Sequence, residues 1–540
     1  MESEIYATIG PPGTGKTTTL SRKATEAAKK FGSRGVLITS LTKAAAVEAA
    51  GRNIPIAKES IGTLHAHAYA ALGCPDIADT PENLRIFSEL FPVYEMTPAG
   101  GFKIGDSPDE MTRMRSLGDE LMSKYQLLRA TLKPRESWSS EIIRFARAWE
   151  MFKEDNHFLD FEDLIEVAAN DVDHAPGDPM VIYGDEAQDW SPSEYRLCLQ
   201  WAKEARALVL FGDWDQALYV WRGSDPNLLK TLDVPQDRRN ILTQSYRVPR
   251  QVHALAQKWI RKVSGRDDIK YEPRDEEGEV RKLQVSYRFP RQCVEDCKRY
   301  IGEGKTVMFL ASCAFMLKPL IAELRDAGVP FHNPYRVKNG LWNPMRGVRR
   351  VIDYLRPDEE AFGDEARAWT WPELWRWIDI VSAKNMVHGM KSSVMKYAAN
   401  PSLKDTPVAS DIQKAIELGD SLFKEGVDWW KGGDPKALMK LVTGRHKRLV
   451  DFASRIAEKQ GKEALTEKPR VIVSTVHGVK GAEADVVYCF PDLSPHGYEQ
   501  FEGGGEPRNE VLRLFYVAFT RARESVVLLA PNNRFAVDWS

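Results

Sequence analysis

One stretch near the start of the chain constrains its fold more than any other feature: Gly10-Pro11-Pro12-Gly13-Thr14-Gly15-Lys16-Thr17. An apolar run, residues 5–9, precedes it, and a segment rich in alanine and lysine, residues 18–30, follows it. These flanks predict a strand and a helix, the context in which the pattern G-x-x-x-x-G-K-S/T binds phosphate. Glycines allow consecutive backbone N–H groups to surround phosphate oxygens at a helix N-terminus. The sequence therefore predicts a nucleoside triphosphate site, in which Lys16 reaches the β- and γ-phosphates and Thr17 ligates Mg²⁺.

Composition narrows the class of protein further. The 540 residues are 43% hydrophobic and 28% charged, which is typical of a globular chain and long enough for three or four domains. The formal net charge is −2, so nucleic-acid binding requires a local basic groove. No apolar run approaches the ~18 residues of a membrane span, and the early first strand leaves no room for a signal peptide. The six cysteines lack metal-ligand spacing. We expect a cytoplasmic protein.

A second informative stretch, Val181 to Asp189, is an apolar strand that ends in the adjacent carboxylates of Asp185 and Glu186. Parallel strands of α/β units bring their carboxyl ends to one crevice, here beside the phosphate loop. Mg²⁺ prefers oxygen ligands, so we expect Asp185 to bind the metal, directly or through water. Glu186 is then placed to polarise an attacking water. The alternative, a solvated acidic turn, is disfavoured by the phosphate loop upstream.

Other residues are predicted to lie along the same edge. Thr39 ends a strand over residues 36–39, and Thr63 and His65 follow in the next segment. His65 is equally compatible with a structural histidine held by hydrogen bonds. Residues 43–50 read as an alanine-rich helix.

An aromatic and basic cluster follows the strand at residues 207–211 and contains Tyr219, Trp221 and Arg222. Next to a nucleotide site, such a cluster suits the stacking of unpaired bases with a cation alongside. Tyr219 is also compatible with an ordinary core position. Trp221 is less so, because its neighbours indicate a surface loop.

The second half of the chain repeats the α/β pattern. Strands are predicted at residues 306–311, 470–475 and 526–530, with a helix over 510–522 that carries Arg521. An arginine that reaches γ-phosphate across a cleft would couple hydrolysis to closure of that cleft. The interruption between the first two strands is mostly helical and holds seven of the 15 tryptophans: Trp342, Trp369, Trp371, Trp375, Trp377, Trp429 and Trp430. We interpret most of them as a separate core, with base stacking as the alternative.

Together these segments resemble the superfamily 1 helicases of the UvrD/Rep (PcrA-like) type. The matching motifs occur in family order and span residues 10–524: GPPGTGKT, TKAAA, GTLHA, DEAQD, GDWDQALYVWRG, QSYR, TVHGVKGAE and YVAFTRAR. The resemblance implies an α/β fold with two RecA-like P-loop domains of parallel strands, each carrying an inserted helical domain. The domains are then expected at 1–71 with 149–243, and at 244–333 with 467–540. The insertions are expected at 72–148 and 334–466.

The resemblance also implies roles for individual residues toward ATP and Mg²⁺. The phosphate loop, Gly10 to Thr18, would hold the nucleotide, with Lys16 and Thr17 on the phosphates and the metal. Asp185 would bind Mg²⁺, and Glu186 would hold the catalytic water. Gln216 would sense γ-phosphate, and Arg247 and Arg521 would act as arginine fingers. Tyr246 would stack on adenine, and Glu483 would approach the ribose.

For nucleic acid, the resemblance implies single-stranded DNA across the tops of both RecA-like domains, tracked 3′ to 5′. The residues expected on this path are Thr39, Thr63, His65, Tyr219, Trp221, Arg222, Thr475 and His477.

The chain departs from the family pattern in places. The adenine-reading glutamine upstream of the phosphate loop has no counterpart in the four residues before Ile5, and Thr18 replaces the usual arginine. We therefore expect weaker selection of ATP over GTP. Ser40 stands where an aromatic residue is usual. Little follows Arg523 beyond a closing strand, so the C-terminal tail of larger members is expected to be absent.

The leading hypothesis is an ATP-driven translocase that separates DNA strands at single-strand/duplex junctions. Two alternatives share the same motor: a translocase that mainly displaces proteins from DNA, and an ATPase subunit activated by a nuclease or replication partner. The YVWRG segment resembles the DNA-type version, which favours DNA over RNA. We expect a monomer at the bacterial nucleoid or in a phage-infected cell, and a repair or replication protein as partner is left open.

Overall fold

The computed structural model describes residues 3–40, 54–97, 116–334, 336, 339–355, 369–424 and 432–539. The chain forms two compact units: residues 1–284 with 310–314 and 475–540, and residues 285–309 with 315–474. The helix expected at 43–50 lies outside the described residues, as do Trp429 and Trp430.

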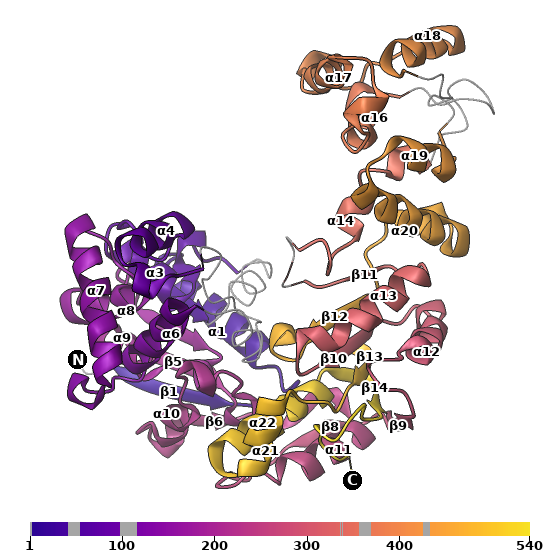
Figure 1. Cartoon of the computed structure of the whole chain (residues 1–540). Helices are drawn as coiled ribbons and strands as arrows, with labels where there is room; N and C mark the ends of the chain where they lie inside the picture. The colour runs from indigo at the N-terminus through magenta and orange to yellow at the C-terminus, as the bar shows by residue number, and fades with distance from the viewer. Residues whose placement is uncertain are drawn as a thin grey trace. The chain divides into compact units, whose positions relative to one another are not determined.

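The first sheet has the strand order β3-β2-β4-β5-β1-β6. Figure 1 labels β1, β5 and β6 of this sheet. Every pair in it is parallel, and β2 and β4 are buried along their whole length, as expected for a sheet covered on both faces. The strands are β1 (Glu4–Ile9), β2 (Val36–Ser40), β3 (Ile61–Gly62), β4 (Val181–Asp185), β5 (Ala207–Gly212) and β6 (Arg239–Ile241). The carboxyl ends of β1 and β4 therefore lie at the same edge, on either side of β5.

Helix α1 (Lys16–Phe31) packs on this sheet through the stripe that its sequence predicts. Leu20, Ala24, Ala27 and Ala28 recur at helical spacing and join a core cluster with Val36 and Ile38 of β2 and Val181 and Tyr183 of β4. This unit also contains α8 (Phe161–Asp171), α9 (Pro192–Ala202), α10 (Pro226–Thr231) and α11 (Arg250–Ile260). This packing holds the start of α1 directly behind the phosphate loop.

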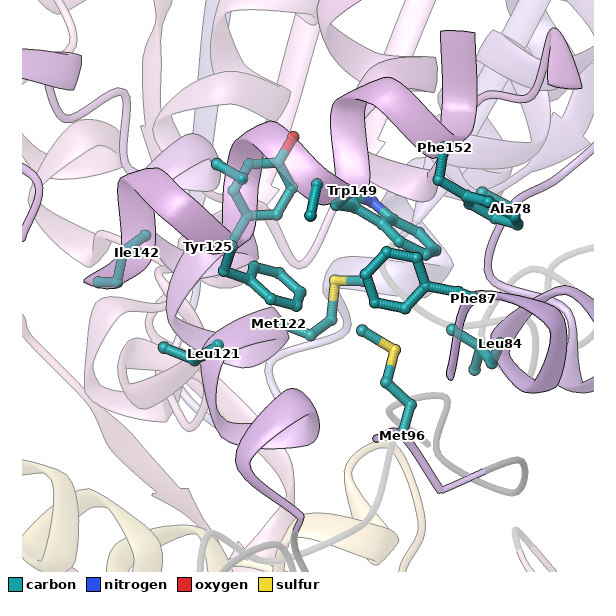
Figure 2. Packing of buried hydrophobic residues seen from close by; sticks show 13 residues of the cluster. Ala78, Leu84, Phe87, Met96, Leu121, Met122, Tyr125, Ile142, Trp149 and Phe152 are labelled. Atoms are coloured by element: carbon teal, nitrogen blue, oxygen red, sulfur yellow. The ribbon is translucent and has the colours of Figure 1, made fainter. Parts of the chain in front are cut away.

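The segment expected as the first insertion is helical where it is described. Its helices are α4 (Pro81–Leu90), α6 (Leu117–Ala130) and α7 (Ser140–Asn156), and α3 (Leu64–Ala71) precedes them. They enclose an aromatic core of their own, in which the rings of Phe87, Trp149 and Phe152 lie within 5.6 Å of one another (Figure 2). A core that is separate from the sheet is what the predicted insertion would need in order to fold.

The second sheet has the order β11-β12-β10-β13-β14-β9, and every pair whose register is described is parallel. Its strands are β9 (Glu279–Leu283), β10 (Val307–Ala311), β11 (Phe331–His332), β12 (Val471–Thr475), β13 (Ala484–Cys489) and β14 (Ala522–Leu529). A two-stranded sheet joins β7 (Gln244–Pro249) to β8 (Glu272–Arg274). The predicted α/β class with parallel sheets is confirmed. The predicted domain boundaries stay predictions.

Helices α21 (Pro495–Gly503) and α22 (Gly505–Phe519) lead to β14, and Arg521 follows α22 rather than lying inside it as we expected. In the second unit, α12 (Arg291–Gly302) and α13 (Lys318–Asp326) flank β10 in sequence. The Trp-rich segment of that unit contains α14 (Met345–Val348), α15 (Ile352–Leu355), α16 (Trp371–Ile378), α17 (Met390–Ala398), α18 (Ile412–Leu422), α19 (Pro435–Leu441) and α20 (Gly444–Gln460).

Tryptophans of this segment form a core, as the sequence suggested. Trp369 and Trp377 are fully buried, with ring centroids 5.9 Å apart, and the ring of Phe423 stacks on Trp377. Figure 1 shows α16, α17 and α18 grouped together, with α19 and α20 between them and β11. In the part of the chain that the structure describes, every helix is too short or too polar to cross a bilayer.

Candidate functional site

The phosphate loop between β1 and α1 has the backbone of an anion site. Gly13 and Gly15 adopt φ angles of +76° and +82°, which glycine reaches without strain. Gly15 is the N-cap of α1 and offers no side chain to its first N–H groups, so these remain available to an anion. Lys16 is buried, and its Nζ donates to the carbonyl of Gly10 at 2.6 Å. The loop therefore fits the triphosphate that the sequence predicts.

Asp185 and Glu186 follow β4 and differ in electrostatic environment. Burial, and then the neighbouring charge of Glu186, raise the pKa of Asp185 well above its usual range. Burial acts on Glu186 in the same direction, but Lys480 and Lys16 outweigh it and hold its pKa low. A buried carboxylate of this kind is stabilised by a cation, and the oxygens of Asp185 and Thr17 are the ligands that Mg²⁺ prefers. The residues present therefore fit the metal.

Gln188 links Glu186 to the end of β5 through two hydrogen bonds. Its Nε2 donates to Glu186 Oε2 at 2.6 Å, and its Oε1 accepts from the backbone N–H of Asp213 at 2.9 Å. Glu186 itself has a left-handed backbone, with φ 54°. Because this conformation is unfavourable for a residue with a Cβ, its surroundings must hold it in place. The glutamine was part of a recognised motif, but our sequence reasoning gave it no role.

Lys480 is a second residue that sequence reasoning missed. Its Nζ contacts Asp189 Oδ2, lies 3.6 Å from Glu186 Oε2 and donates to the carbonyl of Gln216 at 3.1 Å. Burial lowers the pKa of Lys480 to about 8. A signal was present, because three acidic residues in one predicted buried segment require a cation. The charge alone did not show which lysine supplies it.

The two residues that the resemblance assigns to γ-phosphate, Arg521 and Gln216, contact each other. Arg521 Nη2 donates to Gln216 Oε1 at 2.8 Å, and Gln216 Nε2 donates to Asp213 Oδ2 at 2.7 Å. Arg521 Nε is held by the carbonyl of Val517, in the last turn of α22. The arginine is only 2% exposed. A guanidinium from the C-terminal segment thus lies at the end of β5, beside the carboxylates.

The predicted adenine and ribose residues lie against the other side of the loop. The backbone N–H of Tyr246 donates to the carbonyl of Gly13 at 2.8 Å, and its side chain is 75% exposed, which leaves the ring accessible for stacking. Arg247 Nε donates to Glu483 Oε2 at 2.6 Å. A Cβ on Gly13 would lie 2.6 Å from the Cβ of Arg247, so the two segments approach as closely as glycine permits.

The predicted DNA contacts fall into two groups. Thr39 and Thr475 stand at strand ends, but both are buried, and Thr63 caps α3 by accepting from the N–H of Ala66. His65 lies in the first turn of α3, with Nδ1 3.5 Å from Glu194 Oε1. The structure does not bring Thr39 or Thr475 to the surface.

The aromatic cluster is packed around His477. Tyr219 is 1% exposed, and its hydroxyl donates to the carbonyl of His477 at 3.2 Å. Trp221 is half-buried, and its ring meets that of His477 edge-on at 6.4 Å. Of the two interpretations that the sequence left open for Tyr219, this packing favours the core position. Trp221 and Arg222 are only partly buried, as a role in base stacking requires.

Comparisons with known families divide the chain in the same order as its motifs. Residues 4–235 match the UvrD/REP helicase N-terminal domain, and residues 436–532 match the UvrD-like helicase C-terminal domain. The first range contains the phosphate loop, both carboxylates and Trp221, and the second contains Lys480, Glu483 and Arg521.

Individual relatives share low sequence identity with this chain and match only part of it. YjcD of Bacillus subtilis (strain 168) is 23% identical over 461 residues, which is 74% of this chain and 59% of YjcD. The ATP-dependent DNA helicase PcrA of the same organism is 31% identical over 141 residues, 24% of this chain and 18% of PcrA. PcrA of Staphylococcus aureus (strain Mu50) is 32% identical over 120 residues, 21% of this chain and 16% of that protein. The chain thus spans 59% of YjcD and smaller shares of the PcrA proteins.

Proposed function

We propose, on the premise that this chain belongs to the UvrD/Rep family of superfamily 1 helicases, that it is an ATP-dependent DNA helicase that moves 3′ to 5′ on single-stranded DNA. Its substrates are single strands and single-strand/duplex junctions, and it acts as a monomer. The observation that carries the proposal is the contact between Arg521 and Gln216. It places an arginine of the C-terminal segment in the same polar site as Glu186 and Lys480.

In the proposed reaction, Lys16 and the backbone N–H groups of the loop hold the β- and γ-phosphates, and Thr17 and Asp185 hold Mg²⁺. The metal supplies charge neutralisation of the phosphates. Glu186, kept ionised by Lys480, accepts a hydrogen bond from the attacking water. Gln216 and Arg521 donate hydrogen bonds to the γ-phosphate. These bonds replace part of the contact that the two side chains make with each other in this structure.

The adenosine half of ATP lies against the exposed ring of Tyr246, with Glu483 on the ribose. Arg247 completes the phosphate contacts. Because its Nε now donates to Glu483, ribose binding and the position of Arg247 are linked. This link gives one route by which the base end of the nucleotide affects the reacting end.

On the DNA side, Trp221 and Arg222 provide a stacking surface with a cation alongside. Both lie in the same motif as Gln216, within six residues of it, so a change at the γ-phosphate moves the stacking segment. Translocation then follows from alternating grip on the strand during the ATP cycle.

ATP turnover, measured with and without single-stranded DNA, tests the proposal. We expect stimulation by DNA in the wild-type protein and loss of turnover by at least about 10²-fold in Lys16→Ala, because the loop loses its only charged phosphate ligand. Fluorescence anisotropy should show that Lys16→Ala still binds single-stranded DNA. Lys29→Ala, an exposed lysine of the same helix, is the matched control. Wild-type turnover in Lys16→Ala would contradict the site, and DNA-independent turnover would favour a partner-activated ATPase.

A further inference from the structure

A small polar cavity of about 20 Å³ lies in the first unit, between the nucleotide-site turn and the predicted DNA path. We call it the His65 cavity; its polar lining includes His65, Glu162, Asp189, Glu194, Arg222 and Ser224. Three of these residues, His65, Arg222 and Asp189, come from motifs that our sequence analysis singled out. Glu162, Glu194 and Ser224 were given no function there.

Glu194 holds two elements with its two carboxylate oxygens. Oε2 accepts from the backbone N–H of Ser191 at 2.9 Å and completes a capping box at the start of α9. Oε1 lies 3.5 Å from Nδ1 of His65. Both side chains are mostly buried, with 10% of Glu194 and 21% of His65 exposed. The contact therefore lies where solvent screens it little.

Ser191 ends the turn that begins at the catalytic carboxylates. Residues 186–191 contain Glu186 in a left-handed backbone conformation and the short helix Ala187–Asp189. The backbone N–H of Asp189 donates to the carbonyl of Glu186, so the turn is internally bonded. A displacement of Glu186 therefore moves the whole turn, including Ser191. The hydrogen bond from the Ser191 N–H then passes this displacement to Glu194.

The polar groups that line the cavity make a carboxylate at position 194 unfavourable for stability. Burial, and then the charge of Glu194, raise the pKa of Glu162 to about 8. Ser224 is 5% exposed, and its Oγ has no hydrogen-bond partner among the described residues. Two facing carboxyls and an unsatisfied hydroxyl cost stability, and such costs are common where function determines the residues.

We infer that Glu194 is a positioning residue that couples the nucleotide-site turn to the DNA path, by holding Ser191 with one oxygen and orienting His65 with the other. This inference rests on the proposed function, because it takes the turn as part of the ATP site and His65 as a DNA contact. It adds a residue outside the motifs, on α9, to the link between the two ligands.

The chain allows a selective test, because Glu194→Gln separates the two contacts. A glutamine oxygen still caps Ser191, but an uncharged NH₂ group replaces the carboxylate oxygen that faces Nδ1 of His65. The measurement is the ratio of single-stranded DNA dissociation constants without nucleotide and with a non-hydrolysable ATP analogue. We expect the ratio to differ from one by about 5-fold or more in the wild type and by less than about 2-fold in Glu194→Gln. Glu204→Gln, an exposed carboxylate just after α9, is the control.

Thermal melting and a double mutant complete the test. Glu194→Gln should melt within a few degrees of the wild type, and His65→Ala should give the same reduced ratio. The double variant should lose nothing further, because both substitutions remove one interaction. If Glu194→Gln proves unstable, His65→Ala tests the same contact from the other side. A wild-type ratio in the stable variants overturns the inference alone, whereas a wild-type protein that binds no DNA overturns the proposed function.

Discussion

Lys480 supplies the positive charge that compensates two carboxylates of the site. Its side chain is 6% exposed and faces Asp189, which is fully buried, and Glu186. Removing one partner of a buried ion pair leaves the other charge without compensation. A hydrophobic residue at position 480 therefore harms the fold as well as the reaction.

We predict that Lys480→Met lowers the free energy of unfolding by about 3–5 kcal/mol, as measured by urea denaturation. Lys480→Met with Asp189→Asn should recover part of this loss, because the second change removes the unpaired charge. ATP turnover should stay low in both variants, since Glu186 loses the cation that keeps it ionised. An unchanged denaturation midpoint in the single variant would mean that this lysine is solvated in solution.

At the scale of elements, the phosphate loop depends on the close approach of β7. Gly13 combines a positive φ with an absence of space, because an added Cβ would lie 2.6 Å from Arg247 Cβ and 2.7 Å from Ser245 Oγ. Ser245 Oγ also donates to the carbonyl of Pro12. Any side chain at position 13 must therefore push β7 away from the loop.

We predict that Gly13→Ala raises the KM for ATP by about 10-fold or more, because the loop amides and Arg247 no longer converge on the phosphates. Gly265→Ala is the matched control, since Gly265 also has a positive φ, of +67°, but nothing within 4 Å of an added Cβ. The control should cost about 1 kcal/mol of stability and leave the KM unchanged. A KM for Gly13→Ala that equals that of Gly265→Ala would contradict the claim that the phosphate loop depends on the close approach of β7.

Whole strands could be predicted from the sequence, whereas contacts between distant side chains could not. The strands at 4–9, 181–185 and 207–212 were predicted within one residue at either end, because each is an apolar run that ends at glycine or acidic residues. The pair of Lys480 and Asp189 joins residues 291 positions apart, and no local pattern encodes such a contact. Tyr219 and Trp221 are two residues apart in one motif, yet only the tertiary packing separates a buried ring from a half-exposed one.

For the whole molecule, the central claim is that ATP turnover moves the protein along single-stranded DNA. The groups proposed to contact ATP come from distant segments, residues 10–17, 185–186, 216, 246–247, 483 and 521, and all belong to one compact unit. Such an arrangement lets nucleotide state change how these segments are held together, which is the requirement for a motor.

Translocation kinetics test this claim most directly. Protein bound to single-stranded DNA of increasing length, with a fluorophore at either end, is mixed with ATP and a trap that prevents rebinding. We predict that a 5′-end fluorophore reports arrival after a lag that grows linearly with DNA length, and that a 3′-end fluorophore reports immediate departure. Arg521→Ala should abolish the lag-and-arrival signal. Dissociation that is independent of length and of label position, while ATP is still hydrolysed, would contradict the account.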